Sequence, residues 1–302
     1  MNSALLLGVL ASSIMSGTSL LYATLGEIIG ERAGIVNLGV EGIMLVGAAT
    51  GFAVTALSGD AYFGLVIAAL AGAAANLVFA YLVVGRRANQ LATGLALMFF
   101  GFGLSALIGR PFIGALIVGL PKLRLLGLGG PGDPLFSYDL LVYLAVPAAA
   151  LIWWLLFRTT WGLGLRAVGE SPAAAVAAGL RPARLQYQAL AFAGCLGGVA
   201  GAHLALSVTV TWAEGMTDGR GFIAIALVIF AKWNPLWAVA GALLFGGSES
   251  LQLQLQAAGA DVSPFIMNMI PYLLTLLVLT LWGWSGLTAA PAALGRGFYG
   301  VE

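Results

Sequence analysis

Long apolar runs alternate with short polar intervals along the chain, and most of these runs are long enough to form a transmembrane helix. A hydrocarbon core of about 30 Å requires about 20 helical residues. Runs of this kind occur at 4–26, 35–57, 62–84, 90–109, 139–157, 187–211, 236–256 and 265–283. A shorter run, Gly221–Ala231, could cross the membrane or form a re-entrant helix, because hydropathy does not separate the two. The pattern predicts an all-α, polytopic membrane helix bundle of about 8–9 transmembrane helices, in one domain over residues 1–302.

The composition agrees with a membrane protein. Hydrophobic residues make up 61% of the chain and charged residues only 8%, whereas about 25% of residues are charged in soluble domains. The 43 glycines favour close helix packing, since small residues let helix backbones approach one another in lipid. The net charge of +1, without a Lys/Arg cluster, indicates no nucleic-acid partner. The single cysteine, Cys195, excludes an intramolecular disulfide.

Arg and Lys residues are divided unequally between the two sets of loops, and cytoplasmic loops normally carry the excess. One set includes the segment 158–186 and holds nine cations: Arg32, Arg86, Arg87, Arg158, Arg166, Arg181, Arg184, Lys232 and Arg296. The other includes the Pro-rich loop 110–138 and holds four: Arg110, Lys122, Arg124 and Arg220. We therefore expect 158–186 to be cytoplasmic and 110–138 to be external, with the N-terminus outside. This orientation requires Gly221–Ala231 to cross, whereas a re-entrant helix there would change the last two spans and the tail.

The segment 158–186 is a long polar interval between two apolar runs, and it predicts one short helix over Pro172–Ala178. Ser171 is a good N-cap because its hydroxyl can accept from an unpaired backbone N–H, and Pro172 suits the first helical position. Gly179 can adopt the left-handed conformation that closes a helix, and Pro182 prevents its resumption. So short a helix is marginal in water, where about 12–15 residues are needed. We expect a partner protein to hold it.

Polar residues at two other places are candidates for a translocation pathway. Asn37 can cap the second helix, and Glu41 lies one turn further on the same face. Glu41 could complement the helix dipole in a structural role, or it could face the bundle interior near the pathway. Glu249 and Gln252 are three residues apart, share a helix face and could line a polar lumen.

The sequence shows no signature of an enzyme. There is one histidine, His203, which we expect to be satisfied within its helix or near a boundary. Neither a metal-ligand cluster, nor a phosphate-binding loop, nor a Ser/His/Asp pattern is evident, so no catalytic residue, metal site or cofactor is predicted. If the protein moves a solute against a gradient, the energy must therefore come from an ion gradient or from another chain.

Three stretches together resemble the permease subunits of ATP-binding-cassette (ABC) importers, in the superfamily shared by branched-chain amino acid, ribose and nucleoside systems. They are GERAGIVNLGVEGIMLVGA, GLGLRAVGESPAAAVAAGL and GRGFIAIALVIFAKWNPL, at Gly30–Ala48, Gly162–Leu180 and Gly219–Leu236. The forms NLGVEG and GRGFIAIA with WNP are most similar to the general nucleoside and simple-sugar permeases. The resemblance covers nearly the whole chain and preserves the order of these stretches.

The resemblance implies that 162–180 is a coupling segment that docks onto a separate ABC ATPase, which alone would use ATP. The implied coupling residues are Arg166, Gly169, Glu170, Ser171, Ala174, Ala175 and Gly179. It also implies a second permease subunit (a paralogue or a second copy), an external substrate-binding protein, and a multi-pass location in a bacterial inner membrane. The implied solute is a nucleoside or a related purine, and a simple sugar such as ribose is the alternative. A self-contained secondary carrier is a hypothesis of a different class.

Overall fold

The computed structural model describes residues 3–124, 136–257 and 290–296, together with isolated positions between 269 and 280. The long helices are α1 (Ser3–Arg32), α2 (Val40–Ser58), α3 (Ala61–Ala80), α4 (Gln90–Gly109), α5 (Leu140–Arg158), α8 (Pro182–His203) and α10 (Pro235–Ala257). The shorter helices are α6 (Thr160–Glu170), α7 (Pro172–Ala177) and α9 (Arg220–Phe230). The π-helical turns η1 (Tyr81–Gly85) and η4 (Leu204–Val208) extend α3 and α8, and the 3₁₀ turn η2 (Arg110–Phe112) follows α4. The strands β1 (Leu123–Arg124) and β2 (Ser137–Tyr138) form a small antiparallel ladder.

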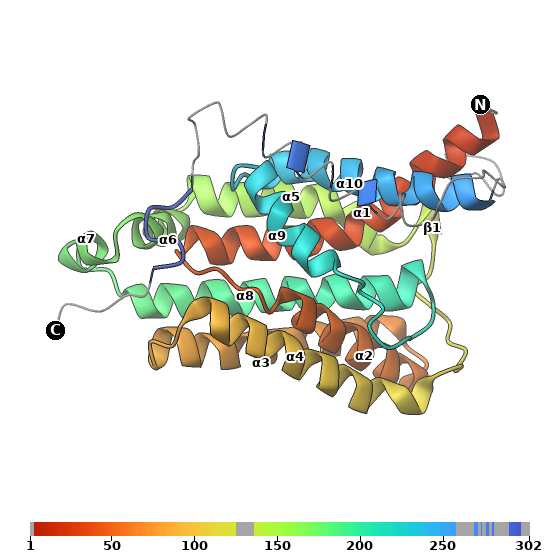
Figure 1. Cartoon of the computed structure of the whole chain (residues 1–302), viewed down its shortest axis with the longest axis horizontal. Coiled ribbons are helices and arrows are strands. Elements are labelled where there is room, and N and C mark those ends of the chain that lie inside the picture. The colour runs from red at the N-terminus through yellow and green to blue at the C-terminus, as the bar shows by residue number, and fades with distance from the viewer. Residues whose placement is uncertain are drawn as a thin grey trace.

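The long helices run roughly side by side, so that their ends gather at two opposite ends of the bundle (Figure 1). α8 packs against α1, α2 and α3, and α10 packs along α1. The helices α6 and α7 protrude at one end, which we call the coupling end, beside the described segment 290–296 (Figure 1). The arrangement confirms a predominantly helical bundle.

Six of the described helices are long and apolar enough to cross a membrane: Leu7–Arg32, Val40–Ser58, Ala61–Gly85, Gln90–Phe112, Leu140–Arg158 and Pro182–Val208. Each overlaps one predicted span, and the ends differ by at most six residues. α10 covers the predicted span 236–256 and has 23 residues, but it is not among these six helices, because the half that begins at Ser248 is polar. The predicted span 265–283 lies outside the described residues, apart from isolated positions.

The predicted short run 221–231 is neither a full span nor a re-entrant hairpin. α9 has 11 residues, which give about 16 Å, half of a hydrocarbon core. The non-helical stretch from Thr209 to Gly219 leads into it from the end of the bundle opposite the coupling end (Figure 1). The C-terminal end of α9 meets Arg32, at the coupling end, through the carbonyl oxygens of Lys232 and Trp233. The chain thus crosses as a loop followed by a half-helix, because α9 alone is too short.

Close backbone contacts at glycines hold the centre of the bundle together. A Cβ atom on Gly201 of α8 would lie 1.8 Å from the Met44 carbonyl oxygen of α2. A Cβ atom on Gly72 of α3 would lie 2.3 Å from the Gly194 carbonyl oxygen of α8. Helices in lipid gain stability from such close van der Waals packing, since burial from water contributes little there. α8 therefore accepts only small residues at these contacts.

The two predicted sets of cations lie at the two opposite ends of the bundle except for Arg220, and the assignment of one end to the cytoplasm stays a prediction. Arg32, Arg158 and Lys232 lie at helix ends or corners of the coupling end. Arg86 and Arg87, which follow η1, and the cations of α6 and of the start of α8 lie there too. Arg220 was expected in an outer loop, but its side chain is only 12% exposed and starts α9 within the bundle. Ala224, one turn later, has its carbonyl oxygen 3.5 Å from Thr24 Oγ1. Because Thr24 lies eight residues before Arg32, Arg220 is about 18 Å inside the coupling end.

Candidate functional site

The segment 158–186 contains two complete helices where one was predicted. Thr159 caps α6 by accepting from the Gly162 N–H at 3.1 Å. Ser171 ends α6 and caps α7, accepting from the Ala174 N–H at 3.3 Å. Gly179 has a φ of +79° and closes α7 as predicted. Pro182 does not prevent a helix: it is the first residue of α8, which begins three residues later, because proline lacks only an N–H that a first turn leaves unpaired.

α7 presents one face outward and one inward, which divides the predicted coupling residues. Ala174 and Gly179 are exposed, and Ser171 is half-buried. Ala175 is only 2% exposed, so its methyl group packs within the protein itself. A partner could contact Ala174 and Val176 but could not reach Ala175. The Ala-rich sequence does not reveal this division, because either face could have turned inward.

Arg166 and Gly169 lie on the inner side of α6, against the end of α1. A Cβ atom on Gly169 would lie 2.2 Å from the Arg32 carbonyl oxygen, so the two backbones touch. The guanidinium groups of Arg166 and Arg32 lie 5.0 and 5.4 Å from the centre of the Phe157 ring. Cations are attracted to aromatic faces at such distances. Arg166 and Gly169 therefore attach α6 to the bundle and do not form its outer surface.

Glu170 is exposed and attached to the segment 290–296. Its Oε2 accepts from the Ala292 N–H at 3.2 Å. The neighbouring Gly169 carbonyl accepts from the Ala293 N–H at 2.9 Å. The turn between α6 and α7 is thus held from both sides, by α1 and by a segment more than a hundred residues later.

Arg32 and Glu31 connect α1 to the corner between α9 and α10. Arg32 Nε donates to the Trp233 carbonyl at 3.1 Å, and the Trp233 indole N–H donates to Glu31 Oε2 at 2.6 Å. Lys232 and Trp233 both have positive φ values, 52° and 55°. Such values are uncommon for side chains of this size and require surroundings that hold them. The hydrogen bonds from α1 supply that support.

The Glu41 carboxylate caps the N-terminus of α9 from across the bundle. Oε1 accepts from the Thr217 hydroxyl at 2.6 Å and from the Gly219 N–H at 2.9 Å, and Oε2 accepts from the Gly221 N–H at 2.6 Å. Glu41 is 2% exposed. A buried carboxylate is stable only with such partners, and a helix N-terminus favours negative charge. These contacts match the structural alternative for Glu41, although the helix it caps is α9 and not its own.

Arg220 and Glu249 form an ion pair between α9 and α10 at the same level. The Arg220 Nη2 group contacts Glu249 Oε1, and the side chains are 12% and 29% exposed. Gln252 lies one turn further along α10 and is half-buried. A charged pair that is partly exposed at membrane depth must face water or another polar surface. Of the predicted pathway residues, Glu249 and Gln252 are therefore the accessible ones.

Asn37 does not cap α2, as its position in the sequence had suggested. The helix begins at Val40, and the Asn37 Oδ1 accepts from the Gly39 N–H at 2.8 Å in the preceding turn. Its Nδ2 donates to Asn76 Oδ1 at 2.9 Å, and Asn76 donates to the Leu190 carbonyl at 2.7 Å. Asn37 is 1% exposed. It therefore joins the start of α2 to α3 and α8.

A buried network around His203 was missed by the sequence reasoning. The Ser19 hydroxyl lies 2.8 Å from His203 Nδ1, and His203 Nε2 lies 3.3 Å from Asp139 Oδ2. Ser207 donates to the same carboxylate oxygen at 2.5 Å. The order Ser, His, Asp resembles a hydrolytic triad, but His203 and Ser19 are 0% exposed, so no substrate reaches them. The single ionisable His inside a predicted span was the signal that could have indicated such a network.

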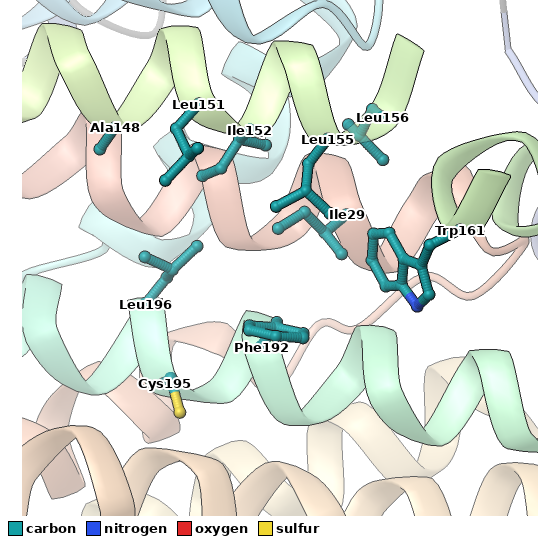
Figure 2. A pocket seen from close by; sticks show the side chains of 10 residues that line it. All are labelled: Ile29, Ala148, Leu151, Ile152, Leu155, Leu156, Trp161, Phe192, Cys195 and Leu196. Atoms are coloured by element: carbon teal, nitrogen blue, oxygen red, sulfur yellow. The ribbon is translucent and has the colours of Figure 1, made fainter. Parts of the chain in front are cut away.

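The apolar pocket in Figure 2 lies between α1, α5 and α8. It encloses about 230 Å³ and is lined by Ile29, Ala148, Leu151, Ile152, Leu155, Leu156, Trp161, Phe192, Cys195 and Leu196. The Trp161 N–H already donates to Gln188 at 3.0 Å, which leaves the Cys195 thiol as the remaining polar group. Solute sites need a few polar groups to fix orientation. This pocket does not supply them, so it is not the candidate solute site.

The sequence matches one described family and several named proteins along most of its length. Residues 9–279 match the family described as the branched-chain amino acid transport system, permease component. The chain is 38% identical to TsgC13 of Haloferax volcanii, which is provisionally named a glucose ABC transporter permease protein, over 90% of this chain and 91% of that protein. It is 31% identical to the guanosine ABC transporter permease protein NupQ of Bacillus subtilis. It is 33% identical to the nucleoside ABC transporter permease protein NupC of Lactococcus lactis; each of these two matches covers 95% of both chains.

Proposed function

Because this chain belongs to the family of permease components of branched-chain amino acid transport systems, we propose that it is the transmembrane permease subunit of an ABC importer. It takes up nucleosides or related purines by alternating access, driven by a separate ATPase subunit. The main support is its identity of 31–33% with guanosine and nucleoside permease proteins over 95% of the chain. A simple-sugar permease is the second candidate, favoured by the 38% identity with TsgC13.

In this proposal, the ATPase docks on the outer face of α7. The capped helix, its exposed Ala174 and Val176 and its position beyond the bundle support this role. Nine cations are expected at or near this end, which favours a cytoplasmic location in a bacterial inner membrane. A second permease subunit and an external binding protein at the 110–138 end complete the proposed assembly.

Movement at α7 has a continuous path of contacts to the interior. α6 touches the Arg32 backbone through Gly169, Arg166 and Arg32 lie near the same Phe157 ring, and Arg32 holds the corner at Trp233. The corner ends α9, whose other end is held by Glu41 and Glu249. Each step is a packed or hydrogen-bonded contact that a rigid displacement could transmit. We propose that α9 carries the movement from the ATPase to the pathway.

We propose that the pathway runs past Arg220, Glu249 and Gln252. Their partial exposure at membrane depth supports this role, whereas Asn37 and Glu41 are fully enclosed and position α2 and α9. A donor beside an acceptor suits the hydroxyl groups and base edges of a nucleoside, and also those of a sugar. The pair therefore does not discriminate between the two candidates.

The docking role is tested with Ala174→Trp, which places a large ring on the exposed face of α7. We expect the purified variant to lose co-purification with its ATPase and ATP-dependent uptake in proteoliposomes. The control is Ala150→Trp, at an exposed position on the α5 helix. Ala175→Trp is unsuitable, because its side chain is buried and the substitution would disturb packing. ATPase binding retained by Ala174→Trp would refute the docking role, and uptake by the chain alone without ATP would identify a secondary carrier.

The solute is tested by purifying the assembly with its external binding protein and identifying the bound small molecule by mass spectrometry. A nucleoside or purine is the expected result. A pentose or hexose would transfer the assignment to the sugar candidate while leaving the permease role intact. Uptake of the identified molecule, with the other class as unlabelled competitor, provides the independent check.

A further inference from the structure

A second cavity lies at the coupling end, between the ends of four segments that are distant in sequence. It encloses about 200 Å³ and is lined by Ile35, Val83, Val84, Arg87, Ala88, Gln90, Pro182, Ala183, Gln186 and Arg296. These residues come from the turn before α2, the connection from the end of α3 to the start of α4, the start of α8 and the segment 290–296. The cavity is separate from the proposed pathway at Arg220 and Glu249.

The charge on its walls is entirely positive. Arg87 and Arg296 are both exposed, and among the residues that the structure describes neither forms an ion pair. None of the described lining residues is Asp or Glu. Arg87 has a φ of +56°, which is uncommon for an arginine and places its backbone in the left-handed conformation between α3 and α4. Two arginines therefore line one cavity that has no carboxylate among its described lining residues.

The backbone of α8 adds to the positive field. Its N-terminus has no side-chain cap, and Ala183 in its first turn lines the cavity. Unpaired N–H groups in a first turn carry a partial positive charge that attracts anions. The uncharged Gln90 amide is already paired within the protein, since its oxygen accepts from the Val36 N–H at 2.9 Å and its nitrogen donates to the Arg296 carbonyl at 3.3 Å.

We propose that this cavity binds the phosphate group of a phosphate monoester, with Arg87 and Arg296 as its paired ligands. Guanidinium groups bind phosphate oxygens in pairs of hydrogen bonds, and helix N-termini are recurrent phosphate sites. Ile35, Val83 and Val84 provide an apolar wall for the organic part of the ligand. The organic part belongs either to a soluble cytoplasmic monoester or to the phosphate headgroup of a membrane lipid.

The cavity is connected to the proposed coupling segment. Arg296 follows Ala292 and Ala293, which donate to Glu170 and to Gly169. A phosphate that binds Arg296 would hold the segment 290–296 against α4 and α8, and with it the turn between α6 and α7. This consequence depends on the proposed docking role of α7, whereas binding of phosphate to the cavity does not.

Binding is measured on the full chain in nanodiscs of phosphatidylcholine, with radiolabelled inorganic phosphate and with glycerol 3-phosphate as competitor. We expect saturable binding that Arg87→Gln combined with Arg296→Gln weakens at least about tenfold, since bonds to charged groups dominate such sites. The matched control is Arg86→Gln, the adjacent exposed arginine, which does not line the cavity. It should change the affinity by less than about twofold, as expected for a charge outside the site.

Three results would overturn the proposal: no saturable binding, unchanged binding in the double variant, or an equal loss in Arg86→Gln. Unchanged melting of the double variant, followed by tryptophan fluorescence, would show that the loss is not due to unfolding. The source of the ligand is decided by nanodiscs that contain phosphatidic acid. Displacement of bound phosphate from the wild-type chain by this lipid supports a headgroup, and retention of bound phosphate supports a soluble monoester.

Discussion

Replacement of Glu41 by glutamine tests the cap on α9. The substitution keeps the shape of the side chain and removes its charge and one acceptor oxygen. If the amide oxygen faces Thr217 and Gly219, the amide nitrogen faces the Gly221 N–H, and two donors then oppose each other. In the reverse orientation the amide nitrogen opposes the Gly219 N–H, and the Thr217 hydroxyl must turn to accept from it. At 2% exposure, water cannot replace the lost partners.

The magnitude follows from the three bonds. Hydrogen bonds to a charged group contribute about 1.5–3 kcal/mol, and those between neutral groups about 0.5–1.5 kcal/mol. Two bonds each lose about 1 kcal/mol when the acceptor becomes neutral, and the third, at Gly221, is lost with about 2 kcal/mol. We therefore expect Glu41→Gln to lower the free energy of unfolding by about 4 kcal/mol. At about 2 °C for each kcal/mol in a large domain, the melting temperature should fall by about 8 °C.

The assay is thermal unfolding of the purified chain, followed by tryptophan fluorescence. Trp233 contributes to this signal as one of eight tryptophans; it is 5% exposed and lies at the opposite end of α9 from the cap. Labelling of Cys195, the single cysteine, with a thiol-reactive dye gives a second probe, and agreement of the two tests whether one transition is measured.

The control is Glu214→Gln, the same chemical change in an exposed ion pair. Glu214 lies 3.1 Å from Arg110, with the two side chains 56% and 65% exposed. Exposed pairs contribute about 0–1 kcal/mol, so its melting temperature should change by less than about 2 °C. The cap interpretation would be refuted if both variants melted within about 2 °C of the wild-type chain. Loss of uptake with unchanged melting would instead support contact between Glu41 and the solute.

Two further predictions concern packing and the buried network. Gly201→Leu should abolish the folded peak on gel filtration, because even its Cβ would lie 1.8 Å from the Met44 carbonyl oxygen. The control Gly103→Leu, where a Cβ would have nothing within 4 Å, should elute as the wild-type protein does. Equal elution of the two variants would contradict the close contact at Gly201. His203→Leu should lower the melting temperature by more than Ser19→Ala does, because it removes the contacts of His203 with both Ser19 and Asp139 and leaves Asp139 only its bonds from Ser207 and the backbone. The opposite order would show that His203 does not hold this network together.

The sequence alone determined the features that depend on neighbours along the chain. Six of the eight predicted spans match described helices, because a bilayer requires long apolar helices. The division of the cations between two sets of loops was predicted because cytoplasmic loops are rich in them. The Ser171 cap and the left-handed Gly179 follow from local chemistry within a few residues. The family resemblance also rests on contiguous stretches, so the order of residues along the chain is sufficient to indicate it.

Only the tertiary structure decided which residues meet across the bundle. Glu41 binds groups at 217–221, and His203 binds Ser19 and Asp139, because the packing of small residues places these helices together. The side chain of Ala175 turns inward and Arg220 starts a half-helix, and the hydropathy of the sequence predicts neither feature. Contacts of this kind depend on the rotation and depth of each helix. A periodic apolar sequence permits several rotations, and close packing in three dimensions selects one of them.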